Sequence, residues 1–489
     1  MLRCCIVSIG FVALLLATLT GGVTAAESLR IGVAEADITP PEGFPLAGYY
    51  FERLATGVRD PLKAKAVVFR GSGREAAFVV ADLTGVSRDL YLEVRKQAAA
   101  KTGIPAEHIV LSATHSHTGP DYYRHLYDYL GKPAADSDSS PYPQKLVDGI
   151  VTAIGEAHAS AAPSIIEAGS AIQQKPVSFN RRFLMQDGSI RTWQRLDSPQ
   201  VLRAAGPIDP EIGLLMIRGP EDRAPRGLVS NFALHLDTVG GTLWSADYPY
   251  FIEQSLRKAL GPKVVSVFGA GTCGDINHAD PVATERNSTE TIGNALATTI
   301  VAGLPDLKPV ENQGFQVRST VVQLPMAEVT EQDLERAQQL LPAAKAGEKV
   351  EFFDQVAAYK AAVLDRLQHA KPRESLTDFV SLGVSHAWGG IGKTLPVEVT
   401  TMTIGNEVAL VFLPGEVFVD LGLAIKRGSP YRTTLVIELS NCVETIYIPT
   451  RAAYAGGGYE VTNSLVEPGS GEMLVEAALR SLRDSASQP

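Results

Sequence analysis

Short apolar runs of strand length alternate with helical stretches along most of this chain. Residues 76–83 and 108–114 have the composition of buried strands, and residues 89–101 between them have the pattern of a helix. The alternation recurs later, with strands predicted at residues 264–268 and 408–413 and helices at residues 251–260 and 417–426. This order of elements predicts one large α/β (mixed α+β) enzyme domain.

The first 25 residues differ from the rest of the chain. Arg3 provides a short positive region, residues 4–19 are almost wholly apolar, and residues 23–25 are small enough for signal-peptidase cleavage. We interpret residues 1–25 as a signal peptide and residues 26–489 as the mature domain, which predicts a secreted or periplasmic protein. A retained membrane anchor is the alternative, and it is disfavoured because no positive cluster follows the apolar run.

The charge balance excludes one broad class of function. The chain carries 44 Lys and Arg against 54 Asp and Glu, for a formal net charge of -10. A protein that binds nucleic acid through a broad electrostatic surface is expected to be basic. We therefore expect no nucleic-acid partner.

Two cysteines, Cys273 and Cys442, follow the predicted signal peptide. Export to an oxidising compartment would permit a disulfide between them. Two buried free thiols are equally compatible with the sequence.

Residues 330–368 have a different composition, rich in Ala, Glu, Gln, Lys and Leu. Thr330 and Asp333 have the spacing of a helix capping pair, and Lys371-Pro372 follows as an end signal. We predict two helices that form an excursion from the main domain at about residues 330–370. A lid over a site and a packing layer are both compatible, and the packing layer is the more common arrangement.

Two histidines follow the strand predicted at residues 108–114 directly. His115 and His117 stand two positions apart, and in extended backbone such residues face the same side. A lone histidine, His235, ends another apolar run. Histidines at strand ends suit a metal or an acid–base site. Polar residues at a loop explain His115 and His117 equally well, and a lone histidine such as His235 is more often structural than a ligand.

Three further polar segments also follow predicted strands. Glu416 follows the strand at residues 408–413 and opens the predicted helix, where the helix dipole gives a carboxylate an ordinary role. A loop of small residues spans 269–278, and Tyr447 lies near a glycine run. The site of an α/β sheet lies at the carboxyl ends of its strands. Together, the imidazoles, carboxylate and phenols are a plausible set of zinc ligands.

At this level of detail the sequence resembles the neutral (alkaline, non-lysosomal) ceramidase family, and the motifs occur in the same order along nearly the whole mature chain. The matching segments are Gly32 to Thr39, Gly48-Tyr49, Ala64 to Phe69, Thr114 to Pro120, Asn180-Arg181, Asn231 to His235, Pro414-Gly415-Glu416, and Tyr447 with Tyr459-Glu460. The resemblance implies a metallohydrolase domain of the neutral ceramidase type.

The resemblance also implies roles for individual residues. The zinc ligands would be His115, His235, Glu416 and Tyr447. His117 would be a second-sphere or general-base histidine. The carbonyl oxygen of the substrate would be polarised by Arg181 and Tyr459.

Two departures from the family pattern bear on the substrate. The family has Gly-Asp-x-Ser-Pro-Asn, and Asn277 occupies the position of its essential serine in the segment Gly274 to His278. An asparagine side chain can hydrogen-bond a substrate but cannot act as a nucleophile. The chain stops soon after Tyr459, so we expect no C-terminal immunoglobulin-like domain.

The resemblance implies a zinc-dependent amidohydrolase that cleaves the N-acyl amide bond of ceramide or a related N-acyl compound with hydroxide generated at the zinc. Two other functions stay open. One is a zinc hydrolase of a different acylated substrate, such as an acyl sugar or an ester. The other is a relative that binds its ligand without turnover. The expected partner is a small-molecule or lipid substrate, which a membrane surface can present.

Overall fold

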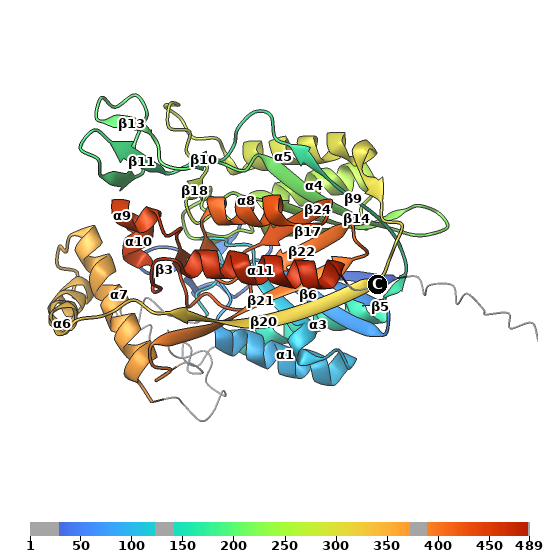
Figure 1. Ribbon diagram of the computed structural model, residues 1–489, viewed down its shortest axis with the longest axis horizontal. Helices are drawn as coiled ribbons and strands as arrows, with labels where there is room; N and C mark the ends of the chain where they lie inside the picture. Colours follow the sequence, from blue (N-terminus) through green and yellow to red (C-terminus); the bar gives the residue numbers. More distant parts are fainter. Residues whose placement is uncertain (1–28, 123–140, 372–388, 488–489) are drawn as a thin grey trace, which may run out of the picture.

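The computed structural model describes residues 29–122, 141–371 and 389–487. The predicted signal peptide lies outside these residues. Within them the fold is mixed α/β, as predicted, and is built on three larger sheets with helices on their outer faces (Figure 1).

The first sheet contains the two strands predicted from the N-terminal part of the sequence. Its strand order is β7-β6-β5-β1-β8. The strands are β1 (Arg30–Asp37), β5 (Lys63–Gly71), β6 (Arg74–Ala81), β7 (Ile109–Ala113) and β8 (Ala162–Pro163), and helices α1 (Arg88–Thr102) and α3 (Tyr142–Ala159) pack against the sheet. β6 and β7 are parallel and are joined through α1, whose first turn is capped by Ser87. The predicted strands and helix of this region are confirmed.

The second sheet has the order β17-β15-β14-β9-β19. Its strands are β9 (Ile165–Ile172), β14 (Glu211–Arg218), β15 (Pro225–Phe232), β17 (Val265–Ala270) and β19 (Lys308–Pro309), and it is covered by helices α4 (Tyr248–Leu260) and α5 (Thr289–Gly303). β15 and β17 are parallel and α4 lies between them in sequence. The strand predicted at residues 264–268 and the helix predicted at 251–260 are confirmed.

The third sheet has the order β20-β21-β22-β24. Its strands are β20 (Phe315–Pro325), β21 (Thr394–Ile404), β22 (Val408–Phe412) and β24 (Thr433–Ile437), with helices α8 (Val419–Gly428) and α11 (Ser470–Ala486) against it. β22 and β24 form a parallel pair joined through α8. The strand predicted at residues 408–413 is confirmed, and the helix predicted at 417–426 begins two residues later.

One apolar core joins the three sheets. Phe78 from β6, Val229 from β15 and Leu410 from β22 all belong to it and are fully buried. Backbone hydrogen bonds also join the strand ends, since the Ala113 amide donates to Leu439 at 3.1 Å and the Glu438 amide donates to Ala270 at 3.0 Å. The carboxyl ends of β7, β17 and β24 are therefore fixed beside one another.

Two excursions extend from this body at the same end of the molecule (Figure 1). The first is the predicted helical pair, α6 (Glu331–Lys345) and α7 (Phe352–His369), and its capping box between Thr330 and Asp333 is confirmed. The second is a small sheet of β11 (Arg182–Met185), β12 (Ile190–Thr192) and β13 (Val201–Ala204), called the flap below. Helices α9 (Ala453–Gly456) and α10 (Tyr459–Asn463) appear between them in Figure 1.

The structure corrects one local prediction. Glu416 does not lie in the first turn of a helix but in the two-residue strand β23 (Glu416–Val417). This strand pairs in parallel with β25 (Tyr447–Ile448), and Glu416 is the register partner of Tyr447. The turn at Gly415, with φ +65°, redirects the chain before the helix begins, so a side chain expected to serve the helix is free to serve the site.

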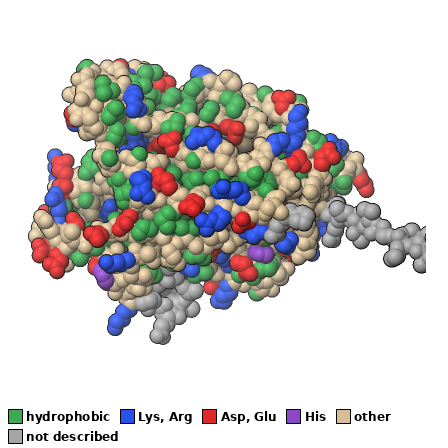
Figure 2. Space-filling view, viewed as in Figure 1, with side chains coloured by type: hydrophobic (Ala, Val, Ile, Leu, Met, Phe, Trp, Pro, Cys, Tyr) green, Lys and Arg blue, Asp and Glu red, His purple; other side chains and the backbone are tan. Residues whose placement is uncertain are grey.

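The distribution of surface charge and the apolarity of the helices are two further features of the described residues. On the face shown in Figure 2, positive and negative side chains are interspersed, without a large field of one sign. Among the described residues, none of the helices has both the length and the apolarity needed to span a bilayer.

Candidate metal and catalytic site

His115 and His117 converge, but the reason differs from the predicted one. His115 has a left-handed backbone, φ +78°, so the pair lies in a turn after β7 rather than in extended strand. The His115 Nδ1–H donates to the Thr84 carbonyl at 2.7 Å, which directs Nε2 toward His117 Nε2 at 3.3 Å. His117 packs against Gly48, where a Cβ would lie 2.7 Å from its side chain. The expectation that strand alternation aligns the two rings is therefore wrong, and the turn aligns them instead.

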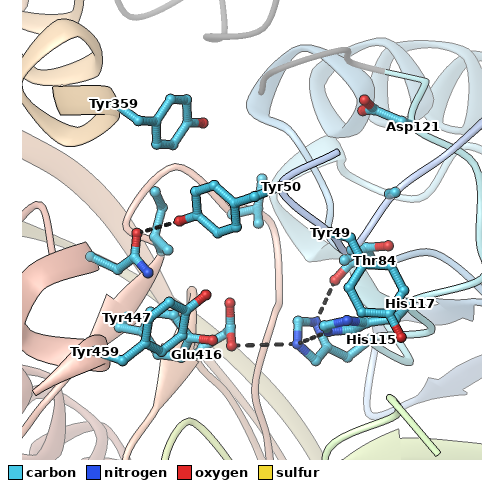
Figure 3. Close-up of a pocket in the computed structure, with 15 residues that line it drawn as sticks. Tyr49, Tyr50, Thr84, His115, His117, Asp121, Tyr359, Glu416, Tyr447 and Tyr459 are labelled. Carbon is cyan, nitrogen blue, oxygen red and sulfur yellow. Dashed lines mark hydrogen bonds and ion pairs between the residues drawn. The ribbon is translucent and has the colours of Figure 1, made fainter. Parts of the chain in front are cut away.

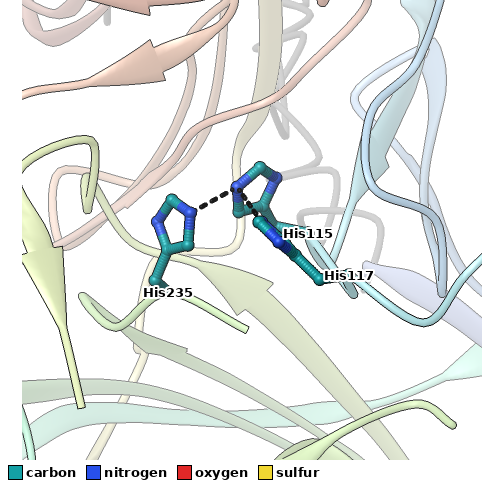
Figure 4. A group of neighbouring side chains, drawn as sticks. All are labelled: His115, His117 and His235. Carbon is teal, nitrogen blue, oxygen red and sulfur yellow. Dashed lines mark hydrogen bonds between the residues drawn. The ribbon is translucent and has the colours of Figure 1, made fainter. Parts of the chain in front are cut away.

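His235 completes a group of three histidines (Figure 4). It follows β15 on the second sheet, and its Nε2 lies 2.9 Å from His115 Nε2. Its Nδ1 faces the Cys273 carbonyl at 3.4 Å. We call His115, His117 and His235 the histidine cluster; their facing ring nitrogens all lie within 4.8 Å of one another.

Glu416 brings a carboxylate to the same point from the third sheet. Its Oε2 lies 3.4 Å from His115 Nε2 and 3.8 Å from His235 Nε2. This oxygen is buried and has no hydrogen-bond partner in the described part of the chain. Each main sheet therefore contributes to one cluster, and the contributions come from turns that follow β7, β15 and β22.

The donor chemistry of this cluster fits a divalent cation. Where an imidazole donates its Nδ1–H to a carbonyl, its Nε2 carries a lone pair, as in most metal-binding histidines. In His115 and His235 these lone pairs face each other and an unpartnered carboxylate oxygen, an arrangement that a positive charge would stabilise. Two or three imidazole nitrogens and one carboxylate oxygen form a common zinc-binding set.

Burial and mutual charge shift the pKa values of the cluster. Burial lowers the pKa of His117 to about 3 and that of His235 well below its ordinary value, and the charge of His115 lowers both further. Burial acts to raise the pKa of Glu416, but His115, Arg181 and Tyr447 outweigh it, so that pKa is lowered. Burial likewise opposes protonation of His115, and Glu416 outweighs it. The cluster thus combines an ionised carboxylate with His115, whose protonation that carboxylate favours, and with His117 and His235, which stay neutral.

Arg181 contacts Tyr447 and is fixed by several hydrogen bonds. Its Nη2 donates to the Tyr447 hydroxyl at 3.0 Å and to the Gly274 carbonyl at 2.8 Å. Its Nε donates to Glu460 Oε1 at 2.8 Å. The sequence predicted Arg181 and Tyr447 as site residues but did not single out Glu460 as one that positions them. Glu460 appeared in the sequence only within the Tyr459-Glu460 motif, and its contacts with Arg181 and the flap span about 280 positions, which no local pattern contains.

Glu460 also holds the flap. It is fully buried, and its Oε2 accepts from Arg182 Nη1 at 2.9 Å and from the Thr192 hydroxyl at 3.2 Å. The Glu460 carboxylate therefore connects the Arg181 guanidinium to the flap.

A pocket opens beside the histidine cluster (Figure 3). Among its lining residues are His115, His117, Glu416, Tyr447, Tyr459, Tyr49, Tyr50 and Tyr359. The rings of Tyr447 and Tyr459 lie 5.6 Å apart, edge to face, and the Arg181 guanidinium lies 5.9 Å from the Tyr459 ring. Burial raises the pKa of Tyr459 to about 12, so its hydroxyl keeps its proton and can donate it in a hydrogen bond.

The helical excursion reaches this pocket through Tyr359 of α7. The same face of α7 continues into the core of the third sheet, where Tyr359, Val363 and Leu367 are buried together. The excursion is therefore a packing layer, as favoured from the sequence, and also one wall of the pocket.

Asn277 lies apart from the histidine cluster. It is in β18 (Ile276–Asn277), which pairs with β10 (Phe179–Asn180), and its Oδ1 accepts from the Ala279 amide at 3.2 Å. It lines a neighbouring pocket with Arg181 and Trp193. The structure thus brings together seven of the eight predicted site residues and places Asn277 near Arg181, in the adjoining pocket.

The two cysteines are free thiols, and both are buried. Cys273 Sγ donates to Glu438 Oε1 at 3.0 Å, while its carbonyl faces His235. The disulfide that the sequence permitted is absent from the structure, and Cys273 instead serves the site through its backbone.

Comparisons with known proteins bear on the family and the fold of this chain. The family model described as neutral/alkaline non-lysosomal ceramidase, N-terminal, matches residues 29–279, slightly more than half of the chain. The neutral ceramidase of Pseudomonas aeruginosa is 28% identical over 212 residues, which cover 42% of this chain and 30% of the relative. The neutral ceramidase of Mycobacterium tuberculosis is 27% identical over 276 residues, 51% of this chain and 40% of the relative. The matches therefore span less than half the length of these two relatives.

Solved structures extend the similarity of fold beyond the matched sequence. The crystal structure of neutral ceramidase from Pseudomonas aeruginosa has a TM-score of 0.68 at 21% identity and covers 94% of this chain and 75% of that one. A ceramidase complexed with C2 has a TM-score of 0.67 at 19% identity and covers 94% and 76%. The mixed α/β fold predicted from the sequence is thus the fold of these proteins, and with the family match this chain belongs to the neutral/alkaline non-lysosomal ceramidase family.

Proposed function

We propose that this protein is a zinc-dependent hydrolase that cleaves the N-acyl amide bond of ceramide or a related N-acyl compound. The observation that carries the proposal is the convergence of His115, His235 and Glu416, whose ring nitrogens and carboxylate oxygen face one another beside a pocket. The family of the chain and the names of its relatives support an amide as the scissile bond.

The proposed zinc ligands are His115, His235, Glu416 and Tyr447. A bound zinc ion supplies Lewis-acid chemistry, which polarises a carbonyl oxygen and makes water acidic near neutral pH. His117 lies 3.3 Å from His115 and is close enough to serve as a further ligand or to accept a proton from the attacking water. The metal content and the pH profile of a His117→Ala variant would separate these two roles.

Arg181 and Tyr459 are proposed to hold the carbonyl oxygen of the substrate as negative charge develops on it. Both lie beside Tyr447, and Glu460 fixes the guanidinium of Arg181. Donors held in place before the reaction stabilise such a charge without reorganisation, and loss of one donor costs about 10²–10³ in rate. No serine is needed in this scheme, and Asn277 can contribute only a hydrogen bond.

The metal content of the purified mature protein, together with fatty-acid release from a short-chain fluorescent ceramide, tests the proposal. We expect near-stoichiometric zinc and release that stops when a chelator removes it. Full release by metal-free protein would contradict the zinc mechanism. Zinc without release would retain the site and favour an acyl sugar or ester as the substrate, or a binding role without turnover.

Two variants test the assignment of residues. We expect His115→Ala to lose zinc and activity together. Tyr459→Phe should keep zinc and lower kcat by about 10², because only one donor is removed. A Tyr459→Phe protein that lost its zinc would show that this residue serves the metal rather than the substrate.

The setting of the reaction is part of the proposal. The apolar N-terminal run predicts export, so we propose a secreted or periplasmic enzyme that meets its lipid substrate outside the cytoplasm. Mass determination of the N-terminus of the exported protein would test cleavage near residue 25.

A further inference from the structure

Exposed aromatic side chains are concentrated around the pocket. In the described ranges, the exposed Phe and Trp residues are Phe51, Trp193, Phe352 and Phe353. Three of them contact a tyrosine that lines the pocket, and Phe353 contacts Phe352. Exposed apolar side chains that gather at one place indicate a binding surface, whereas single ones scattered over the surface do not.

Trp193 is held in position by its backbone. It follows β12 of the flap and has φ +58°, a conformation that a bulky side chain rarely adopts. Its amide donates to the Arg181 carbonyl at 2.8 Å, and its ring centroid lies 4.9 Å from that of Tyr459 while the side chain stays 49% exposed. Strained backbone that is maintained by its surroundings is concentrated at functional sites.

Phe352 reaches the same ring from the other excursion. It is the first residue of α7 and stacks on Tyr459 at 5.8 Å with an interplanar angle of 18°. It also meets Tyr50 edge to face at 5.4 Å and Trp193 at 6.4 Å. The flap and the helical pair, about 160 positions apart in sequence, are therefore joined by aromatic contacts around Tyr459.

Apart from the Tyr459 hydroxyl, which the proposed function assigns to the carbonyl oxygen of the substrate, this wall offers mainly ring atoms to a ligand. The Tyr50 hydroxyl donates to Asn463 Oδ1 at 2.7 Å and is therefore engaged within the protein. Trp193 and Phe352 add rings that are largely apolar. A sugar would require hydrogen-bonding partners at this place, whereas a hydrocarbon chain requires only apolar contact.

We propose that Trp193 and Phe352 determine specificity by extending the pocket into an aromatic wall, formed with Tyr50 and Tyr459, that binds the unbranched hydrocarbon chain of the substrate. The inference rests on the proposed function, since the chain bound here belongs to the molecule whose amide lies at Glu416 and Arg181. It adds the two residues that distinguish long chains from short ones.

The test compares N-hexanoyl and N-hexadecanoyl substrates with the same head group. Each methylene buried on the wall contributes about fourfold to binding. In Trp193→Ala and Phe352→Ala, we expect the ratio of kcat/KM for the long chain to that for the short chain to fall at least about tenfold. Zinc content should match the unchanged protein. Trp193→Phe should restore most of the ratio, because it retains an apolar ring.

Phe353→Ala is the matched control, since Phe353 is the next residue of α7 and is 50% exposed. We expect it to leave the ratio unchanged. An equal loss for both chain lengths in Trp193→Ala and Phe352→Ala, or no loss for either, would overturn the inference.

A binding measurement separates failure of this inference from failure of the proposed function. We expect Trp193 fluorescence to shift to the blue when hexadecanoic acid is titrated below its critical micelle concentration, and not with hexanoic acid. Trp193→Phe identifies the signal, because it removes the reporting indole. A shift in a protein that cleaves no amide would retain the chain site and reject the amidase. Cleavage with no shift and an unchanged chain-length ratio would reject the chain site alone.

Discussion

The histidine cluster with Glu416 and the aromatic wall both contribute side chains to one pocket and are built differently. The cluster lies at strand ends of three sheets that share one core, and His115 and His235 are at most 2% exposed. The wall comes from a flap and a helical pair outside that core, and Trp193 and Phe352 remain partly in water. The difference teaches that reaction chemistry is placed where the backbone cannot move, while substrate selection is placed on peripheral segments that can vary without disturbing the metal site.

Removal of one histidine should break this comparison most strongly. We expect His235→Ala to lose zinc and to lower activity more than about 10³-fold, since neither the ligand nor the polarising ion remains. Metal analysis and a standard amide assay measure both effects. His158→Ala is the matched control, because His158 is a partly exposed histidine paired with Glu75 at 3.0 Å and far from the cluster in sequence. Retained zinc in His235→Ala would remove this histidine from the ligand set.

Glu460 tests whether the two regions depend on one another, because it holds both Arg181 and the flap. Glu460→Gln leaves buried guanidinium groups without their counter-charge, so we expect kcat to fall about 10²-fold while zinc is retained. Stability should also fall by about 3–5 kcal/mol, the usual cost of breaking a buried ion pair. Steady-state kinetics and denaturant unfolding check the two parts. Unchanged kcat would show that Arg181 does not need this carboxylate.

Glu444 tests the pH response of the core that supports the cluster. Burial raises the pKa of Glu444 from 4.5 to about 7. The folded protein therefore holds this proton up to about pH 7, whereas the unfolded chain releases it near pH 4.5. The resulting stability is complete below pH 4.5 and is lost as the pH rises to about 7.

In Glu444→Gln this loss should be absent, because the amide cannot ionise. As the pH rises from 5 to 8, we expect the free energy of unfolding of the variant to increase by up to about 3 kcal/mol relative to that of the unchanged protein. Urea unfolding at the two pH values measures the difference. Parallel pH profiles of the two proteins would show that Glu444 ionises normally in the fold.

The smallest effect is expected in the helical pair, whose second helix carries Phe352. Thr330→Ala removes the capping box of α6 and should cost about 1 kcal/mol, confined to the helical pair. Hydrogen exchange should show about fivefold less protection in α6, with β7 and β22 unchanged. Zinc content should not change. Equal loss of protection in the core strands would mean that the excursion and the core unfold together and are not independent regions.

Much of the fold and part of the site followed from local sequence patterns. The strand and helix periods predicted β6, β7, β17, β22 and the helices α1, α4, α6 and α7, because these elements bury their apolar faces in a regular way. His115, His235 and Glu416 could be singled out because each follows a predicted strand directly, and the resemblance to the ceramidase family implied their roles. That three different sheets bring them together was not contained in the local patterns.

Other parts depended on contacts that no local pattern contains. The pairing of Glu416 with Tyr447 and the joint hold of Glu460 on Arg181 and the flap connect residues tens to hundreds of positions apart. The sequence predicted that His117 lies beside His115 because alternate residues of a strand face the same side. In the structure it is the left-handed turn at His115 that brings His117 into the cluster.

The sequence by itself therefore determined the types of elements, the family and most of the polar side chains of the site, since these depend on neighbours in the chain. The tertiary structure alone decided which side chains meet. It alone joined Trp193 and Phe352 around Tyr459, because packing between distant segments selects such contacts through shape and burial rather than through sequence spacing.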